Sequence, residues 1–384
     1  MSPEVVVRRF GFCLFIIIGC RQLLGGDLTL LEYQGIETGL KDTSFYEFSF
    51  QLKEDGSLLH LNLHGYLDQG RFNIWFAGGG YEVIGNYDFE GQFEMENELF
   101  GPLNNKEPIQ VRVSTNHADG EWQMVFSEIS KQRNVMTMFL SGILMVIVSL
   151  LFIIGWKRIS QSPFRWWLVG AGLWIVGVAL KFGCAFLLNS PTLEFLKSTF
   201  GQIGYLSIGS FYIGLLTGVF EIGITLVFAL FIKTMFENGK RAVMIGVGAG
   251  TFEALLLGFA PIGNAILALS GNPVGNTVLS QISQLAMTTP LLWLIGSVER
   301  TLAILCHISS RTLVLYAVAR KRYIYFWAGF LIMTAIDTIA GYFHLAGLLN
   351  RVSLWWVELS ILPFAIISIP IIRWCVRNWA TGNS

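Results

Sequence analysis

Charged residues are scarce in this chain of 384 residues, because Asp, Glu, Lys and Arg together make up only 14% of it. Typical soluble domains carry about a quarter. The formal net charge is zero, so no overall field attracts the chain to nucleic acid or to acidic partners. Hydrophobic residues make up 53%. We therefore expect a membrane protein that has no nucleic-acid partner.

Cysteine is also sparse: there are five, and none lies in residues 27–134, so that stretch cannot hold an internal disulfide. No CxxC pair or Cys/His spacing typical of structural zinc is present. The sequence also lacks, in a suitable context, a P-loop, a GxSxG nucleophile motif, an HExxH zinc motif and a dinucleotide-binding fingerprint. These absences argue against nucleotide and dinucleotide chemistry.

The first 26 residues have the pattern of a signal peptide. Arg8 and Arg9 precede an apolar run, Phe10–Gly19, that is too short to span a bilayer comfortably. The run ends in IIGC, which resembles a bacterial lipobox, and this resemblance implies lipidation of Cys20. Cleavage without lipidation and an uncleaved anchor are the alternatives.

Residues 27–134 alternate apolar and polar side chains, which is the period of half-buried strands. Clear runs lie at Phe48–Leu52, Leu59–Leu63, Phe72–Phe76 and Trp122–Phe126. Turn signals containing glycine separate them, among them residues 68–70 and 119–120. We predict an extracytoplasmic β-sandwich of seven or eight short strands.

His60 and His64 lie four residues apart, so on a strand they would share one face. They could form half of a metal site, or they could belong to a solvated face opposite the leucines. No catalytic constellation is present in this stretch, and we expect it to serve in recognition or shielding.

Residues 135–376 contain seven apolar stretches long enough to cross about 30 Å of hydrocarbon. They cover approximately 135–156, 164–188, 205–232, 243–269, 288–318, 324–348 and 354–374. Lys and Arg gather after the first and seventh stretches, between the third and fourth, and between the fifth and sixth. The positive-inside rule therefore predicts a multi-pass protein of the cell membrane, with the β region outside and residues 377–384 as a cytoplasmic tail.

Ionisable residues inside these spans are candidates for function, because charges at bilayer depth are costly. A rise of about 1.5 Å per residue predicts that four of them, on four helices, share one buried level. These four are Glu221, Glu253, His307 and Asp337. The same count places Glu299, Arg300 and His344 nearer the outer surface, where the first two form an outer layer and His344 is interfacial. Lys181 and Glu358 are weaker candidates.

Glycine spacing suggests how two of these residues meet. Gly246, Gly250 and Glu253 share one helix face, and small residues let a neighbouring helix approach closely. Arg300, His307 and Arg311 form a second stripe, with spacings of seven and four. A buried carboxylate facing a histidine can activate water, with the histidine orienting the water or stabilising an oxyanion. A structural polar cluster that holds helices together is the alternative.

Two stretches carry a resemblance to a known family. Residues 246–254, GVGAGTFEA, resemble the glycine-rich glutamate helix of YhfC-type membrane proteins. Residues 299–307, ERTLAILCH, are similar to that family's Glu-Arg helix and its following histidine. The resemblance covers residues 135–376 and implies an intramembrane peptidase related to the CAAX-protease and bacteriocin-processing superfamily.

The resemblance also implies roles for individual residues. Glu253 would be the general base, His307 the partner that orients water or the oxyanion, and Asp337 the acid that ends the last motif. Glu221, Glu299 and Arg300 complete the candidate site. Ala249 and Met333 stand where the family often has histidines. Whether the site works without a cofactor or with a divalent metal is left open.

Two classes of function follow from the sequence. The first is an intramembrane peptidase, a hydrolase whose partners are membrane lipid and a membrane-embedded or lipid-modified protein substrate. The second is a catalytically inactive homologue, or a seven-helix receptor or scaffold whose ectodomain binds a ligand. A transporter is a weaker third idea, because the spans show no internal repeat.

Overall fold

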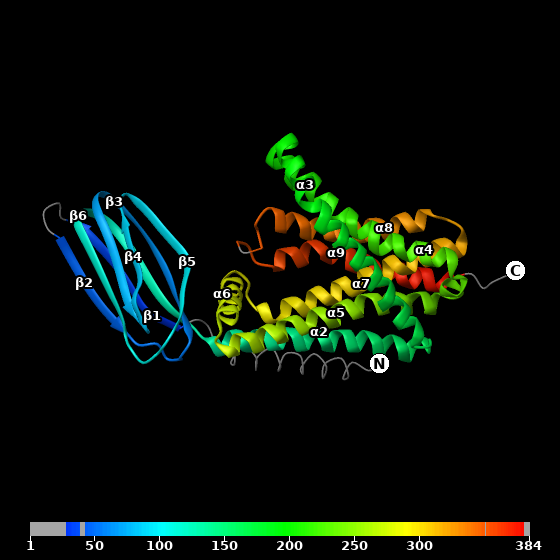
Figure 1. Cartoon of the computed structure of the whole chain (residues 1–384), viewed down its shortest axis with the longest axis horizontal. Coiled ribbons are helices and arrows are strands. Elements are labelled where there is room, and N and C mark those ends of the chain that lie inside the picture. Colours follow the sequence, from blue (N-terminus) through cyan, green and yellow to red (C-terminus); the bar gives the residue numbers. More distant parts are fainter. Residues whose placement is uncertain (1–27, 39–42, 350, 380–384) are drawn as a thin grey trace, which may run out of the picture. The chain divides into compact units, whose positions relative to one another are not determined.

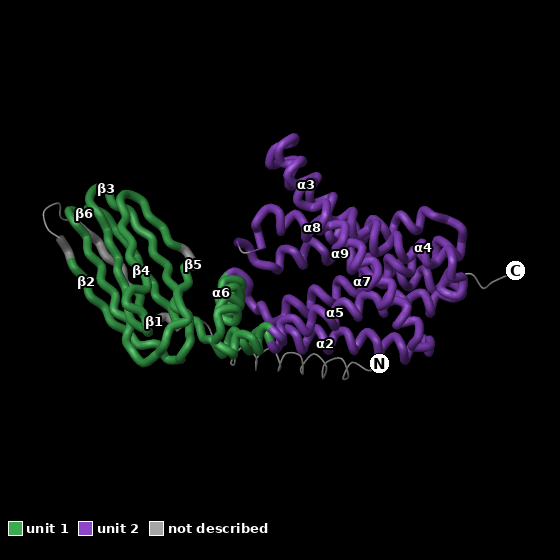
Figure 2. Tube along the Cα trace, in the orientation of Figure 1, with its two compact units in different colours: residues 1–138, 264–287 green, residues 139–263, 288–384 purple. Residues whose placement is uncertain are grey.

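The computed structural model describes residues 28–38, 43–349 and 351–379, so the expected signal peptide with Cys20 lies outside the described residues. The chain divides into two compact units (Figures 1 and 2). The first comprises residues 1–138 and 264–287, and the second comprises residues 139–263 and 288–384.

The first unit contains the β region. Within residues 28–38 and 43–129, six antiparallel strands form one sheet: β1 (Leu28–Thr38), β2 (Thr43–Phe50), β3 (Ser57–Gly78), β4 (Tyr81–Phe89), β5 (Gln92–Leu103) and β6 (Ile109–Ile129). The two long strands, β3 and β6, pair along their whole length. β1 and β2 pair with successive halves of β6, whereas β5 and β4 pair with successive halves of β3.

The strand number differs from the prediction because two predicted turns lie inside β3 and β6. Gly70 and Gly120 have φ angles of 87° and 154°. The pairing shifts register between Leu67 and Arg71, where Gln69 lies opposite Asp119. A Cβ on Gly120 would lie only 2.0 Å from the backbone oxygen of Tyr66. The glycines therefore bend two paired strands instead of reversing the chain.

The bend brings the two halves of the sheet together around one core. The rings of Phe72 and Trp122 lie 5.0 Å apart, and those of Phe76 and Phe126 lie 5.3 Å apart. These partners come from opposite halves of the sheet, since Phe72 pairs with Thr115 and Trp122 pairs with Gly65. All four rings are buried, and each contributes about 1.5–3 kcal/mol of transfer free energy. The alternating pattern in the sequence is thereby confirmed as a half-buried antiparallel sheet.

The first unit also contains a helix that the sequence did not predict, α6 (Pro273–Thr288). The Asn272 side chain caps its start by accepting a hydrogen bond of 2.8 Å from the Gly275 backbone. Leu279 packs with Leu58 and Ile129 of the sheet. The helix is amphipathic and short, so a search for long apolar runs does not detect it.

The second unit is helical. The helices of the chain that supply it are α2 (Lys131–Ser160), α3 (Arg165–Thr217), η1 (Gly218–Gly223), α4 (Ile224–Phe231), η2 (Lys233–Phe236), α5 (Gly239–Ser270), α7 (Leu292–Arg320), α8 (Ile324–Leu345) and α9 (Trp355–Arg377). Within the described residues, six helical stretches are long and apolar enough to cross a membrane. The chain is thus a multi-pass membrane protein.

One of these stretches, Arg165–Phe231, contains two of the predicted spans. It is 67 residues long, about 100 Å at a helical rise, which is far more than a bilayer requires. Gly201 interrupts it with non-helical angles of φ 66° and ψ −165°. The seven apolar stretches of the sequence therefore correspond to six helical stretches, because two of them lie in Arg165–Phe231, which is kinked at Gly201.

Candidate active site

A close seam between α5 and α7 positions the two central residues of the site. A Cβ added to Gly246 would lie 2.7 Å from Ile308 Cα, and one added to Gly250 would lie 3.0 Å from Ile304 Cα. Only residues without a side chain allow this approach. Glu253, one turn further along α5, then faces His307 on α7. The seam predicted from the glycine spacing is confirmed.

Glu253 has three close side-chain partners. Its Oε2 lies 2.8 Å from His307 Nε2 and accepts a hydrogen bond of 2.8 Å from Trp174 Nε1. Its Oε1 accepts a hydrogen bond of 2.7 Å from Arg300 Nη1. A carboxylate offers about four lone-pair positions. Three are used, so the Glu253 carboxylate retains roughly one position for a water molecule.

His307 is only 4% exposed and has a second partner on its own helix. Its Nδ1 lies 2.6 Å from Nη1 of Arg311, one helical turn further on. Arg311 is completely buried, and its Nη2 lies 3.5 Å from Glu221 Oε2. The histidine therefore connects Glu253 to a buried guanidinium.

Glu221 lies in η1, a π-helical turn between α3 and α4. Such turns occur frequently at functional sites. Glu221 accepts a hydrogen bond of 2.8 Å from Lys181 Nζ and is only 3% exposed. Lys181 lies on α3 and brings a second cation, beside Arg311, to this buried carboxylate.

Asp337 joins the group from α8. Its Oδ2 accepts a hydrogen bond from the Thr217 hydroxyl and lies 3.6 Å from Lys181 Nζ. Lys181 therefore links Asp337 to Glu221, and Arg311 links Glu221 to His307 and Glu253. Side chains from α3, η1, α5, α7 and α8 form one connected polar network.

All six predicted site residues line one cavity of about 100 Å³. They are Glu221, Glu253, Glu299, Arg300, His307 and Asp337, and Lys181 and Met333 line it with them. By distance, Glu221, Glu253 and His307 could share a metal ion, because one donor atom from each lies within 4.8 Å of the others. The cavity is large enough for a few water molecules. The structure brings the residues together, and their catalytic roles stay predictions.

The prediction of a separate outer layer is wrong for Arg300. Counting the helical rise locates backbone depth only, and the long arginine side chain extends beyond it. Arg300 Nη1 reaches Glu253, and Arg300 Nη2 contacts Glu299, its neighbour in the chain. Both residues belong to the central network. His344 is exposed near the end of α8, as expected of an interfacial residue.

Three residues of the network received little or no weight from the sequence. Lys181 ranked as a weak candidate, although it connects two of the acids. Arg311 stood in the predicted stripe with His307, and the spacing of four signalled their contact. Trp174 carried no signal, because its indole resembles any interfacial tryptophan until its bond to Glu253 is seen.

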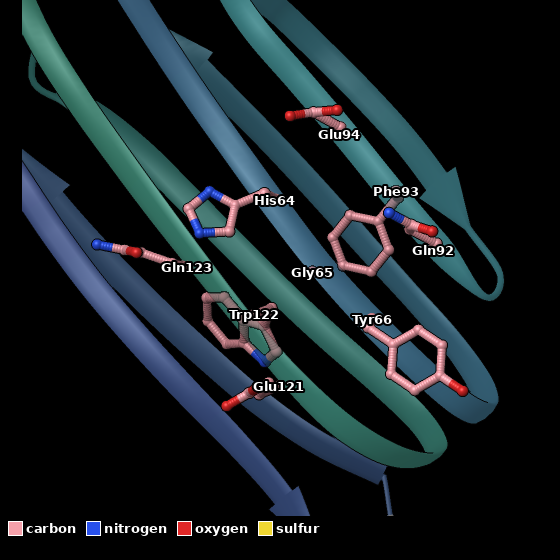
Figure 3. A pocket seen from close by; sticks show the side chains of 9 residues that line it. All are labelled: His64, Gly65, Tyr66, Gln92, Phe93, Glu94, Glu121, Trp122 and Gln123. Carbon is pink, nitrogen blue, oxygen red and sulfur yellow. The ribbon is translucent and has the colours of Figure 1, made fainter.

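The sheet has a different polar surface, a hollow of about 540 Å³ (Figure 3). In the strand register, His64 lies between Glu94 and Gln123, and Tyr66 lies between Gln92 and Glu121. His64 is exposed, whereas His60 is buried, so the solvated face predicted for the two histidines holds only for His64. Among the described residues, no group of three metal-ligating side chains includes either histidine.

A family model supplies the comparison with known proteins. The model described as YhfC intramembrane metalloprotease matches residues 143–359, which is more than half of the chain. The match contains every ionisable residue of the cavity and leaves the sheet outside. No curated protein matches the chain.

Proposed function

The chain belongs to the YhfC intramembrane metalloprotease family, and from this premise we propose that it is an intramembrane peptidase acting on a membrane-embedded or lipid-modified protein. One observation carries the proposal. Buried His307 and partly buried Glu253 form a pair, 2.8 Å apart, beside a cavity large enough for water. Lipid is the expected surrounding of such a site, because the helices that form it have the length and apolarity of membrane spans.

Glu253 acts as the general base in the proposed reaction. Its remaining lone-pair position accepts a proton from a water molecule in the cavity while the water oxygen attacks the scissile carbonyl carbon. The carbonyl becomes a tetrahedral oxyanion. The proton on Glu253 then passes to the departing amide nitrogen as the C–N bond breaks. The products are a carboxylic acid and an amine, the acid then loses its proton to the amine or to water, and Glu253 returns to its initial ionised state.

Donors in the cavity wall stabilise the oxyanion. His307 is the partner suggested by the family resemblance, and its single N–H, which faces Glu253 in the free site, would have to turn to the oxyanion. Lys181 is a second donor, because its side chain is 22% exposed and its ammonium group reaches both Glu221 and Asp337. Fixed donors in a water-poor site act more strongly than the same groups in bulk water. Arg300 orients the base through Oε1 of Glu253.

The family description implies a metal, and the donor chemistry of this chain does not fit one. The distances among Glu221, Glu253 and His307 are short enough. However, Arg311 donates to His307 Nδ1, so Nε2 carries the ring proton and offers no lone pair. Glu221 is also held between Lys181 and Arg311. No step of the proposed reaction passes through a metal.

We propose the orientation predicted from the basic residues. Contacts between helix ends gather these residues at one end of the helical unit. Trp156 donates to the Lys240 backbone at 3.2 Å, and Tyr316 donates to the Asn378 backbone at 3.4 Å. The positive-inside rule makes this end cytoplasmic. Export of the β region and lipidation of Cys20 belong to the same proposal.

The test is a comparison of peptide N-termini in membranes that contain the full chain or a variant. Glu253→Gln keeps the size of the side chain and removes the base. We expect it to lower cleavage about a hundredfold to ten-thousandfold. Glu194→Gln is the matched control, since this exposed carboxylate on α3 contacts only Ser190 among the interactions that the structure shows for it. Equal cleavage by the wild type and Glu253→Gln would contradict the proposal.

An inactive homologue is the second candidate, and one observation favours it. Met333, which stands where the resemblance placed a histidine, lines the cavity. If the network serves only to hold the helices together, Glu253→Gln will weaken folding, and the wild type will produce no new N-termini. The same experiment therefore separates the two candidates.

A further inference from the structure

We infer that Arg311 is a positioning residue that fixes the ring proton of His307 on Nε2, so that His307 is a hydrogen-bond donor in the cavity and not a metal ligand. The inference deepens the proposed function, because its catalytic meaning rests on the peptidase reaction. The proton position itself can be measured without any substrate.

The geometry leaves the histidine little freedom. Arg311 follows His307 by one turn of α7 and is completely buried. Its Nη1 lies 2.6 Å from His307 Nδ1, and its Nη2 lies 3.5 Å from Glu221 Oε2. On the other side of the ring, Nε2 lies 2.8 Å from Glu253 Oε2. Both ring nitrogens therefore have a close partner.

The two partners decide where the proton resides. A guanidinium has only N–H donors and keeps its proton in proteins. Nδ1 must therefore present its lone pair to Arg311. A neutral imidazole has one donor and one acceptor, so the proton is on Nε2 and points to the Glu253 carboxylate. In a doubly protonated ring, the N–H at Nδ1 would point at the N–H of Arg311 Nη1 across only 2.6 Å. This arrangement therefore excludes the imidazolium.

The same argument bears on metal binding. A histidine binds a metal through an unprotonated nitrogen, and its other N–H usually donates to a carboxylate or carbonyl oxygen. In this site a donor, Arg311, stands at the second nitrogen. The nitrogen that faces Glu253 is the protonated one. His307 is thus prepared to donate, and ligation would require breaking its contact with Arg311.

Cationic side chains supply the positive charge that a metal would bring. Lys181 contacts Glu221 and Asp337, Arg300 contacts Glu253 and Glu299, and Arg311 lies between Glu221 and His307. Burying three cations is costly unless each is paired, and each has an anionic neighbour. A divalent ion would add two further charges beside cations that already compensate most of the acids.

The first experiment measures the proton directly. The full chain, labelled with ¹⁵N-histidine and held in detergent micelles, is studied by long-range ¹H–¹⁵N correlation. His307→Gln identifies the His307 signals among the five histidines. We expect Nδ1 to have the ¹⁵N chemical shift of an unprotonated ring nitrogen and Nε2 to have that of a protonated one. Protonation at Nδ1 in the wild type would overturn the inference.

Two variants separate positioning from general structure. Arg311→Lys retains a side chain that can donate hydrogen bonds but cannot accept them. This variant should preserve the proton on Nε2 of His307. Arg311→Met removes the donor, so Nδ1 no longer has to be bare, and we expect Nδ1 to gain a proton while Nε2 stays protonated beside Glu253. If Arg311→Met does not fold, the wild type and Arg311→Lys still decide the question. A bare Nε2 in Arg311→Lys would contradict the proposed role.

The second experiment titrates the purified full chain with Co²⁺ or Zn²⁺ alone. We expect no binding of one ion per chain that depends on His307 in the wild type, and measurable His307-dependent binding in Arg311→Met, because the donor at Nδ1 is removed. One ion per wild-type chain that is lost in His307→Gln would overturn the inference. These readouts are independent of cleavage. An inactive protein with the expected tautomer would end the proposed function and leave the role of Arg311 standing.

Discussion

The hollow on the sheet and the cavity among the helices are both lined by carboxylates and a histidine, but their surroundings differ. In the hollow, His64, Glu94 and Glu121 are exposed to water. In the cavity, Glu221 and His307 are almost completely buried, and each is held by an arginine or lysine. Charges in a water-poor site interact several times more strongly than exposed ones. Residue type alone therefore does not distinguish a candidate active site, whereas burial with pairing does.

The largest expected difference between the two regions concerns ion pairs. Arg300→Met leaves Glu253 without its cation in a buried site, and we expect a loss of about 3–5 kcal/mol of unfolding free energy. Arg112→Met removes the pair with Glu47, in which both side chains are more than half exposed, and should cost about 0–1 kcal/mol. Unfolding of the full chain in mixed micelles measures both. Equal losses would remove the contrast between the regions.

A smaller effect is expected from adding one methyl group at the helix seam. Gly246→Ala forces α5 and α7 apart, because its Cβ would lie 2.7 Å from Ile308 Cα. Overpacking of this kind costs about 1–3 kcal/mol, and it should lower cleavage by separating Glu253 from His307. Gly172→Ala is the matched control, since nothing lies within 4 Å of its added Cβ. Stability and cleavage are measured in the same preparations, and unchanged cleavage in Gly246→Ala would count against a tight seam.

The smallest expected effect concerns Tyr66, which lines the hollow on the sheet. It tests whether a change in the protonation of Tyr66 leaves the cavity unaffected. The Tyr66 hydroxyl donates to Asp68, and this hydrogen bond, together with the negative charge of Asp68, raises the pKa of Tyr66. The pKa of Tyr66 is therefore higher in the folded chain than in the unfolded chain. The contribution of this hydrogen bond to stability is fully present below the unfolded pKa and is lost as the pH rises through the folded pKa of Tyr66. Asp68→Asn should lower the pKa of Tyr66, as followed by ultraviolet absorbance. Asp68→Asn should leave the cleavage rate unchanged. A change in cleavage together with the change in the pKa of Tyr66 would show that the sheet and the cavity are coupled.

Much of this arrangement could be predicted from the sequence where one physical rule dominates. Alternating apolar residues predicted the half-buried strands, and the spacing of Gly246, Gly250 and Glu253 predicted the seam that faces His307. Turn chemistry at Gly70 and Gly120 was wrongly interpreted, because a glycine that permits a positive φ serves a bend within a strand as well as a turn.

Other features depend on information that a local pattern does not contain. The position of Arg300 follows from the reach of its side chain toward Glu253, and rise per residue does not report that reach. The bond from Trp174 to Glu253 joins residues 79 positions apart in the chain. Helix α6 is too short and too polar to appear in a search for membrane spans.

The π-helical turn that carries Glu221 has a consequence for how the network can move. A π turn holds one residue more than the α-helical turn it replaces. Passing that extra residue along the helix by one position would swing a side chain through about 100° around the axis, while the flanking segments keep their places. Glu221 lies within such a turn, whereas Glu253, His307 and Asp337 lie within the α-helices α5, α7 and α8. The direction of the Glu221 side chain, and with it the contacts to Lys181 and Arg311, therefore depends on where that extra residue stands in the helix.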